Sequence, residues 1–345
     1  MKDFRSDNTA PVSPEILAAL AAANGGTATA YGDDDVSQGL QAKFAALFER
    51  EVTVHPVATG TAANALSLAA ITPPWGVIFA HEHAHIRVDE CGAPEFFTGG
   101  GRITGLPGSG GKLTPDLLHE AIAACAPHGA HNMQPGSVSL SQSTEAGCVY
   151  SADEVHALCE IAHRAGLKVH MDGARIANAV AGTNRSLADL TWRAGVDVLS
   201  FGATKNGAMA AEAIVCFDAA VAATLDFRRK RAGHLFSKMR FVSAQLDAYV
   251  SDGLWLRNAR AANAAAARLG AGIGKIAGAA LLVPVQANEV FARLPEATIA
   301  RLLELGFRFH RWDQAFGPGA VRLVTGFHTA QTDVDSFLHA AAAPR

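Results

Sequence analysis

Residues 167–175 read LKVHMDGAR, and residues 196–207 read VDVLSFGATKNG. Each stretch starts with a β-rich apolar run and leads to a residue that can carry charge, Asp172 in the first and Lys205 in the second. The capping box formed by Ser151 and Glu154 predicts a helix that ends at Gly166, directly before the first run. Strands that alternate with helices in this way predict a mostly parallel sheet with helices on both faces.

Further β-rich runs extend this pattern toward both ends of the chain. They are VTVHPV (52–57), VIFA (77–80), SVSLSQ (137–142) and AIVCF (213–217). The last run follows VDVLSF after a short connection, so we expect one antiparallel neighbour in the sheet. The sequence therefore predicts an α/β fold.

The pattern changes after about residue 245. A long alanine-rich helix leads to VPVQ, EVFARL, a helix near 296–305, FRFHRW, AVRLVTG and a closing helix. We therefore expect a large domain with an N-terminal arm over residues 1–245 and a small C-terminal α/β domain over residues 246–345.

Composition narrows the class of protein. Of the 345 residues, 49% are hydrophobic and 18% charged, and the formal net charge is −3, which gives no polyelectrolyte attraction to nucleic acid. The five cysteines form no CxxC pair, and the apolar stretches contain charges before they could span a bilayer. The first residues lack the apolar core of a signal peptide. We expect a cytoplasmic protein that binds neither nucleic acid nor membrane.

Polar residues follow several of these strands where the strands end. They are Thr59, Gly60 and Thr61 after the first strand, Gln142, Asp172 and Lys205. Because ligands of open α/β sheets gather at the carboxyl ends of the strands, we expect these residues to lie close together. Alone, Asp172 could be a helix cap and Lys205 a solvated lysine. Together, they suit a pyridinium cofactor, whose ring nitrogen a carboxylate keeps protonated and whose aldehyde a lysine amine captures.

Two more features suit such a cofactor and its substrate. Thr59-Gly60-Thr61 joins a strand to a helix, and free N–H groups at a helix N-terminus bind phosphate, although a simple N-cap has the same appearance. Arg175 in HMDGAR and Arg322 in VRLVTGF carry guanidinium groups that could hold a substrate carboxylate or form structural ion pairs.

These motifs together resemble the threonine aldolases among the fold-type-I pyridoxal-phosphate enzymes, and most of all the low-specificity L-branch with its phenylserine-cleaving relatives. The resemblance runs along nearly the whole chain through RSDNTAPVSPEIL, YGDDD, ATGTAANAL, HAHIRVDECGAPEF, HMDGARIANAV, SFGATKNG and RLVTGF. It implies reversible cleavage of a β-hydroxy-α-amino acid, such as L-threonine, L-allo-threonine or L-phenylserine, into glycine and an aldehyde.

The resemblance also implies roles for individual residues. Lys205 would be the Schiff-base lysine and Asp172 the partner of the pyridine nitrogen, with Thr59, Gly60 and Thr61 around the phosphate. The remaining roles concern the ring and the substrate: His85 would stack on the ring, Gln142 would lie beside it, and Ser6, Arg175 and Arg322 would bind the substrate carboxylate, with His131 near the substrate hydroxyl. His85 and His131 are both candidates for the catalytic base.

The same resemblance implies a homotetramer built from two catalytic dimers. Basic residues would reach the phosphate site of the neighbouring subunit, and Lys230 matches the first of them. The second, usually an arginine, falls at Ser237, next to Lys238. This departure leaves the second contact between subunits open.

Other interpretations remain at this point. His81, His83 and His85 share one face if the chain there is a strand, which could bind zinc, although packing and ring stacking suit them better. The stretch GLPGSGGK (105–112) departs from the P-loop pattern at two positions. A β-eliminating lyase or an aminotransferase would use the same Lys205 and Asp172, and a non-catalytic protein that binds pyridoxal phosphate is a more remote alternative.

Overall fold

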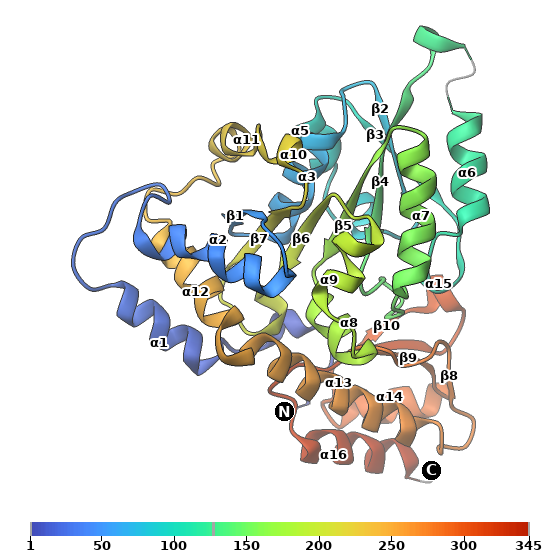
Figure 1. Cartoon of the computed structure of the whole chain (residues 1–345). Coiled ribbons are helices and arrows are strands. Elements are labelled where there is room, and N and C mark those ends of the chain that lie inside the picture. The colour runs from blue at the N-terminus through green and yellow to red at the C-terminus, as the bar shows by residue number, and fades with distance from the viewer. Residues whose placement is uncertain (1, 126–127, 344–345) are drawn as a thin grey trace.

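The computed structural model describes residues 2–125 and 128–343. Its centre is a seven-stranded sheet in the order β1-β7-β6-β5-β4-β2-β3 (Figure 1). The strands are β1 (Thr53–Val57), β2 (Gly76–His81), β3 (Arg102–Leu106), β4 (Gln134–Ser141), β5 (Lys168–Gly173), β6 (Val198–Gly202) and β7 (Glu212–Cys216). Strands β6, β5, β4, β2 and β3 pair in parallel, whereas β7 pairs antiparallel with both β6 and β1. The predicted α/β class and the antiparallel neighbour are therefore confirmed. Strand β3 was not predicted.

Helices lie on both faces of this sheet (Figure 1). The helices of this part of the chain are α1 (Pro14–Ala23), α2 (Asp35–Phe48), α3 (Gly60–Ile71), α4 (His85–Val88), α5 (Ala93–Thr98), α6 (Pro115–Ala124), α7 (Ala152–Arg164), α8 (Ile176–Thr183), α9 (Leu187–Leu190), α10 (Ala219–Ala222), α11 (Leu225–Arg231) and α12 (Arg240–Val250). Alternation along β6 shows why both faces are apolar: Val198 packs with α3, and Leu199 packs with the larger core on the other face.

A second sheet lies beyond the long helix α13 (Leu254–Ile273). It has the order β10-β11-β9-β8, with β8 (Ala280–Leu281), β9 (Glu289–Arg293), β10 (His310–Arg311) and β11 (Ala320–Val324). Helices α14 (Glu296–Glu304), α15 (Asp313–Phe316) and α16 (Gln331–Ala342) complete this part. It has its own apolar core, which Phe4 of the N-terminal arm joins. The division of the chain at residue 245 stays a prediction.

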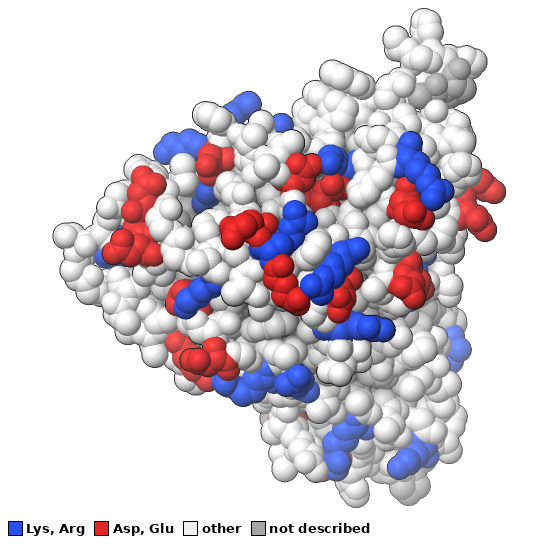
Figure 2. All heavy atoms as spheres, in the orientation of Figure 1, with Lys and Arg blue, Asp and Glu red and all other residues white. Residues whose placement is uncertain are grey.

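The surface carries charges of both signs. Figure 2 shows Lys and Arg interspersed with Asp and Glu over the visible face, without a broad area of one sign. Within the described ranges, no helix combines the length and apolar character that crossing a bilayer requires.

Candidate active site

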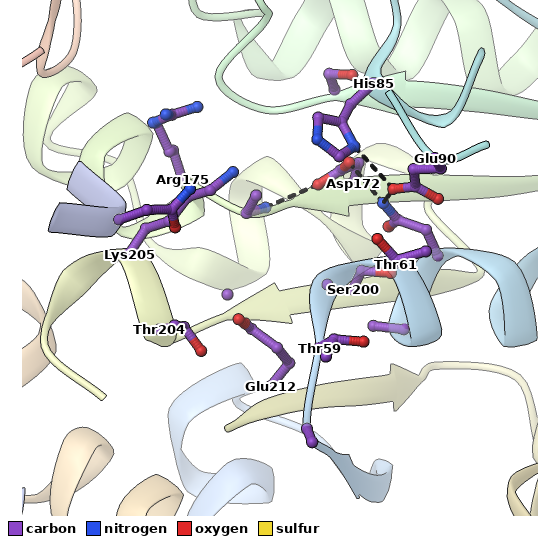
Figure 3. Close-up of a pocket in the computed structure, with 18 of the residues that line it drawn as sticks. Thr59, Thr61, His85, Glu90, Asp172, Arg175, Ser200, Thr204, Lys205 and Glu212 are labelled. Atoms are coloured by element: carbon purple, nitrogen blue, oxygen red, sulfur yellow. Dashed lines mark hydrogen bonds and ion pairs between the residues drawn. The ribbon is translucent and has the colours of Figure 1, made fainter. Parts of the chain in front are cut away.

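A cavity of about 420 Å³ opens at the carboxyl edge of the large sheet (Figure 3). The ends of β4, β5 and β6 meet there, and so does the start of β7, because β7 runs antiparallel and Glu212 pairs with Gly202. The residues that line the cavity include Asn8, Thr59, Gly60, Thr61, Asn64, His85, Glu90, Ser141, Ser143, Glu145, Asp172, Arg175, Ser200, Thr204, Lys205, Met209 and Glu212. Six residues predicted for cofactor binding, together with Arg175, therefore surround one space.

The N-terminus of α3 forms one wall of this cavity. Thr59 is the N-cap, and its side chain accepts a hydrogen bond from the backbone N–H of Ala62 at 3.1 Å. A Cβ added at Gly60 would meet no atom within 4 Å, so the backbone there can be approached closely by a ligand. Free N–H groups and the helix dipole make this wall suitable for a phosphate group.

Asp172 is a buried carboxylate at the end of β5. Its Oδ2 accepts a hydrogen bond from Asn64 Nδ2 at 2.8 Å, and its Oδ1 accepts one from the Ala174 backbone N–H at 2.9 Å. Burial alone would raise the pKa of Asp172, but the positive charge of Lys205 and the Ala174 N–H outweigh burial and hold this pKa below its ordinary value. The cavity thus contains a fixed negative charge opposite a lysine amine.

His85 is held by a network that extends to Asp172. Its backbone N–H donates to Glu145 Oε1 at 2.9 Å, and its ring Nδ1 lies 2.8 Å from Glu90 Oε1. Asn64 Nδ2 donates to the same Glu90 oxygen at 2.8 Å. The hydrogen bond with Glu90 raises the pKa of His85, because the carboxylate stabilises the charged imidazole. Sequence reasoning did not assign Glu90 or Asn64 a role, although both lie within the quoted motifs.

Two further buried carboxyl groups of the cavity were also missed. Glu145 accepts a hydrogen bond from Ser141 Oγ at 2.7 Å, and Glu212 accepts one from the Ala203 backbone N–H at 2.8 Å. Burial raises the pKa of Glu212 to about 7, so its charge changes near neutral pH beside Lys205. A single sequence gives no signal for either, since an isolated glutamate is usually a surface residue.

The three histidines considered as an alternative zinc site are not arranged as one. Strand β2 ends at His81, so the three histidines do not share one face of a strand, and the His81 ring instead lies 3.0 Å from the Gly108 carbonyl oxygen. A different trio, His85, Glu90 and Asp172, has ligand atoms within 4.8 Å of one another. Asn64 already bridges two members of this trio through hydrogen bonds.

The predicted carboxylate-binding residues lie where the N-terminal arm meets the two sheets. Arg175, directly before α8, donates from Nε and Nη2 to the Asp7 carboxylate at 2.8 and 3.0 Å. Arg322 on β11 does not line the cavity and lies 3.2 Å from Glu289. Ser6 precedes the short turn Asp7–Thr9, and its Oγ accepts the Asn8 N–H at 3.1 Å.

Two predicted residues lie away from the cavity of their own chain. Gln142 is fully buried. Its Nε2 donates to the Tyr150 carbonyl oxygen at 2.9 Å, and its Oε1 accepts the Tyr150 backbone N–H at 3.0 Å. Ser141 and Ser143 line the cavity instead. His131 is exposed and precedes the amino end of β4, at the opposite edge of the sheet. Neither side chain enters the cavity of its own chain, because counting along the sequence does not show where a strand begins or where a side chain points. The predicted roles of Gln142 beside the ring and of His131 near the substrate hydroxyl stay predictions.

Lys230 also lies outside this cavity. It is on α11, with its Nζ 4.4 Å from the centre of the Tyr31 ring. Ser237 and Lys238 precede α12, and the carbonyl of Ser237 accepts the Tyr31 N–H at 3.0 Å. Contacts of Lys230, Ser237 or Lys238 with a neighbouring subunit stay predictions.

A lysine and a buried aspartate at adjacent strand ends of a mostly parallel sheet, beside the N-terminus of a helix, define a pyridoxal-phosphate-dependent enzyme of fold type I. The residues fit that cofactor: Asp172 offers a fixed negative charge, Lys205 an amine and Gly60 an open approach to the backbone. Ser143 Oγ is buried and has no hydrogen-bond partner among the described residues, so a bound polar ligand can supply one.

Comparison with known proteins identifies the family. A model of the family described as "Beta-eliminating lyase" matches residues 3–297. The low specificity L-threonine aldolase of Pseudomonas sp. (strain NCIMB 10558) is 40% identical over 333 residues, which cover 96% of this chain and 95% of that protein. The enzyme of the same name from Pseudomonas aeruginosa is 41% identical over 328 residues, covering 95% and 93%.

A solved structure agrees with these relatives. The threonine aldolase of Leishmania major superposes with a TM-score of 0.92 at 26% identity and covers 99% of this chain and 98% of that one. The chain belongs to the beta-eliminating lyase family and, within it, to the low-specificity L-threonine aldolases, which depend on pyridoxal phosphate.

Proposed function

We propose that this protein is an aldolase that reversibly cleaves L-threonine, L-allo-threonine and the aryl analogue L-phenylserine to glycine and an aldehyde. The observation that carries the proposal is that buried Asp172, Lys205 and Arg175 line one cavity. The 40% identity to a low specificity L-threonine aldolase along 96% of the chain supports the substrate class.

Four groups of the cavity hold the cofactor in this proposal. Lys205 would hold its aldehyde through the side-chain amine, and Asp172 would hold its ring nitrogen through a negative charge. Thr59, Gly60 and Thr61 would hold its phosphate, and His85 would contact its ring. When bound, pyridoxal phosphate withdraws electrons from the bond that breaks next to the amino-bearing carbon.

Arg175, which lines the cavity, orients the substrate by its α-carboxylate, and Arg322 and Ser6, which lie outside the cavity lining, are further contacts of that carboxylate in this proposal. A guanidinium group can hold a carboxylate with two parallel hydrogen bonds, which fixes the rotation of the amino acid. That rotation selects the bond between the α- and β-carbons for cleavage and supplies several kcal/mol of barrier reduction, on the order of the gains from orientation in other enzymes.

His85 acts as the base that accepts the proton of the β-hydroxyl group. Donation from Nδ1 to Glu90 leaves Nε2 as the free acceptor nitrogen. In the same chain His131 is exposed at the far edge of the sheet, which favours His85 over His131.

This base role makes the pH dependence of turnover testable. Wild-type turnover falls as pH drops through the raised pKa of His85, because only the neutral ring accepts a proton. Glu90→Gln removes the carboxylate that raises this pKa, so we expect the acidic limb of the pH–rate profile to move to lower pH. Asp89→Asn, which removes an exposed charge next to Glu90, is the matched control. An acidic limb that stays in place in Glu90→Gln would contradict the base assignment.

Product analysis decides between this reaction and its rivals. Aldehyde and glycine are measured from L-threonine, L-allo-threonine and L-phenylserine with the purified holoenzyme. We expect aldehyde and glycine in equal amounts. The family description favours β-elimination as the second candidate, and that reaction would give ammonia and a keto acid instead. An absence of any product with the cofactor bound would support a non-catalytic protein.

We also propose a cytoplasmic homotetramer built from catalytic dimers. All five cysteines are free, which suits a reducing compartment. Phe96 and Phe227 are exposed to 78% and 75%, and burial of such side chains between subunits would remove apolar surface from water. Light scattering of the holoenzyme measures the number of subunits, and a monomer would contradict the assembly.

A further inference from the structure

Two arginines and two buried carboxylates meet behind the cavity. Asp7 takes the Nε and Nη2 edge of Arg175 with two hydrogen bonds. Glu289 lies between the arginines: its Oε2 is 3.7 Å from Arg175 Nη1, and its Oε1 is 3.2 Å from Arg322 Nε. Both carboxylate side chains are only 1% exposed. The charges of the four side chains therefore cancel without any ligand.

Glu289 interacts with the two arginines as an ion pair, and part of this interaction lacks hydrogen bonds. Glu289 Oε2 and Arg322 Nε are buried, and neither makes a hydrogen bond within the part of the chain that the structure describes. By contrast, Asp7 is bound bidentately by Arg175 and also accepts a hydrogen bond from Asn288 Nδ2 at 3.0 Å. Glu289 is thus the carboxylate that faces both guanidinium groups while its Oε2 has no hydrogen-bond partner among the described residues.

Glu289 also joins two parts of the fold. It begins β9 in the small sheet and pairs with Val324 on β11, two residues from Arg322. Arg175, in contrast, follows β5 of the large sheet and lines the cavity. A carboxylate fixed on the small sheet therefore interacts with the cation that the cavity presents to ligands.

We propose that Glu289 is a built-in anionic competitor that sets the affinity of the site for the α-carboxylate of amino acids. The inference rests on the proposed function, in which Arg175 and Arg322 bind that carboxylate. With Glu289 ionised, a ligand carboxylate enters a cluster that is already neutral. Removal of this one negative charge leaves the cluster positive and strengthens its attraction for an incoming carboxylate.

Glu289→Gln removes the negative charge of this side chain and keeps its size and shape. Gln keeps an oxygen beside Arg322 Nε, and the Arg322 guanidinium also lies over the Trp312 ring, 4.9 Å from its centre, so the arginine keeps its position. Glu289→Gln is therefore expected to bind carboxylates more tightly without rearranging either arginine. A role limited to holding Arg322 in place predicts the opposite sign, weaker binding.

The experiment compares wild type, Glu289→Gln and Glu304→Gln, where Glu304 is an exposed glutamate on α14 of the same part of the fold. The dissociation constant of glycine is measured from the visible absorption of the bound cofactor, and acetate is titrated as a competitor. We expect Glu289→Gln to lower the glycine and acetate constants and the KM for L-threonine by roughly tenfold, with kcat within about twofold of wild type. Glu304→Gln should match wild type.

Unchanged or weaker glycine binding in a Glu289→Gln protein with normal cofactor content and melting temperature would overturn the proposal. Glu289→Met removes the same charge with an unbranched apolar side chain and replaces the Gln variant if the latter does not fold. Failure of both variants to fold would also overturn the proposal, because it would give Glu289 a structural role. If wild type releases no aldehyde, the proposed reaction fails, but the glycine and acetate constants still test Glu289.

Discussion

Replacement of Lys205 by alanine is expected to lower turnover of L-threonine by roughly a thousandfold or more. Lys205 is the lysine among the described residues that line the cavity, so no other amine there can bind the cofactor aldehyde covalently. The visible absorption that comes from the covalent bond should disappear with the activity. Product release and the absorption spectrum measure the two effects separately.

Replacement of a lysine outside the cavity is the control for this experiment. Lys275 is exposed beyond the end of α13, so Lys275→Ala should keep both turnover and colour. Lys205 is itself only partly buried, in a short turn after β6, so we expect the Lys205→Ala variant to stay folded. Its melting temperature checks this. A Lys205→Ala protein with the spectrum and rate of wild type would rule out the assignment of this lysine.

Asp172→Asn is expected to lower kcat by about a hundredfold to ten-thousandfold, on the order of 3–5 kcal/mol in the barrier. Asp172 is buried and its pKa is held below its ordinary value, and in the proposed function its negative charge would keep a proton on the ring nitrogen of the cofactor. Asparagine has no charge, so the ring nitrogen loses its proton more easily and withdraws electrons less strongly. The measurement is kcat for L-threonine, with cofactor content determined on the same samples.

A local hydrogen bond bears on this test. Asn64 Nδ2 donates to Asp172 Oδ2, and an amide NH2 group at that position in Asp172→Asn would face the NH2 group of Asn64. Asp153→Asn removes an exposed carboxylate on α7 and should leave kcat unchanged. If Asp172→Asn keeps its cofactor and stays within about tenfold of the wild-type kcat, the charge of Asp172 is not needed for the reaction.

The pattern of strands and helices could be predicted because it depends on local chemistry. Alternating strands and helices, the helix start at Ser151 and the motifs around Asp172 and Lys205 are properties of short segments. Strand β3 was missed, because its five residues contain a glycine and carry few β-formers. Asn64 was not assigned a role for a different reason: its partners Glu90 and Asp172 lie 26 and 108 residues further along the chain. Glu90 lies only five residues from its partner His85, but the sequence does not show that the two side chains turn toward each other.

The sequence by itself determined the α/β class, the family and the presence of Asp172, Lys205, His85 and the segment 59–61 at strand or helix ends. Only the tertiary structure decided which side chains enter the cavity. It turned Gln142 toward Tyr150, left His131 at the far edge of the sheet and set Glu289 between Arg175 and Arg322. The reason is physical: strand and helix signals are local, whereas the direction of a side chain and its charged neighbours depend on how distant segments pack.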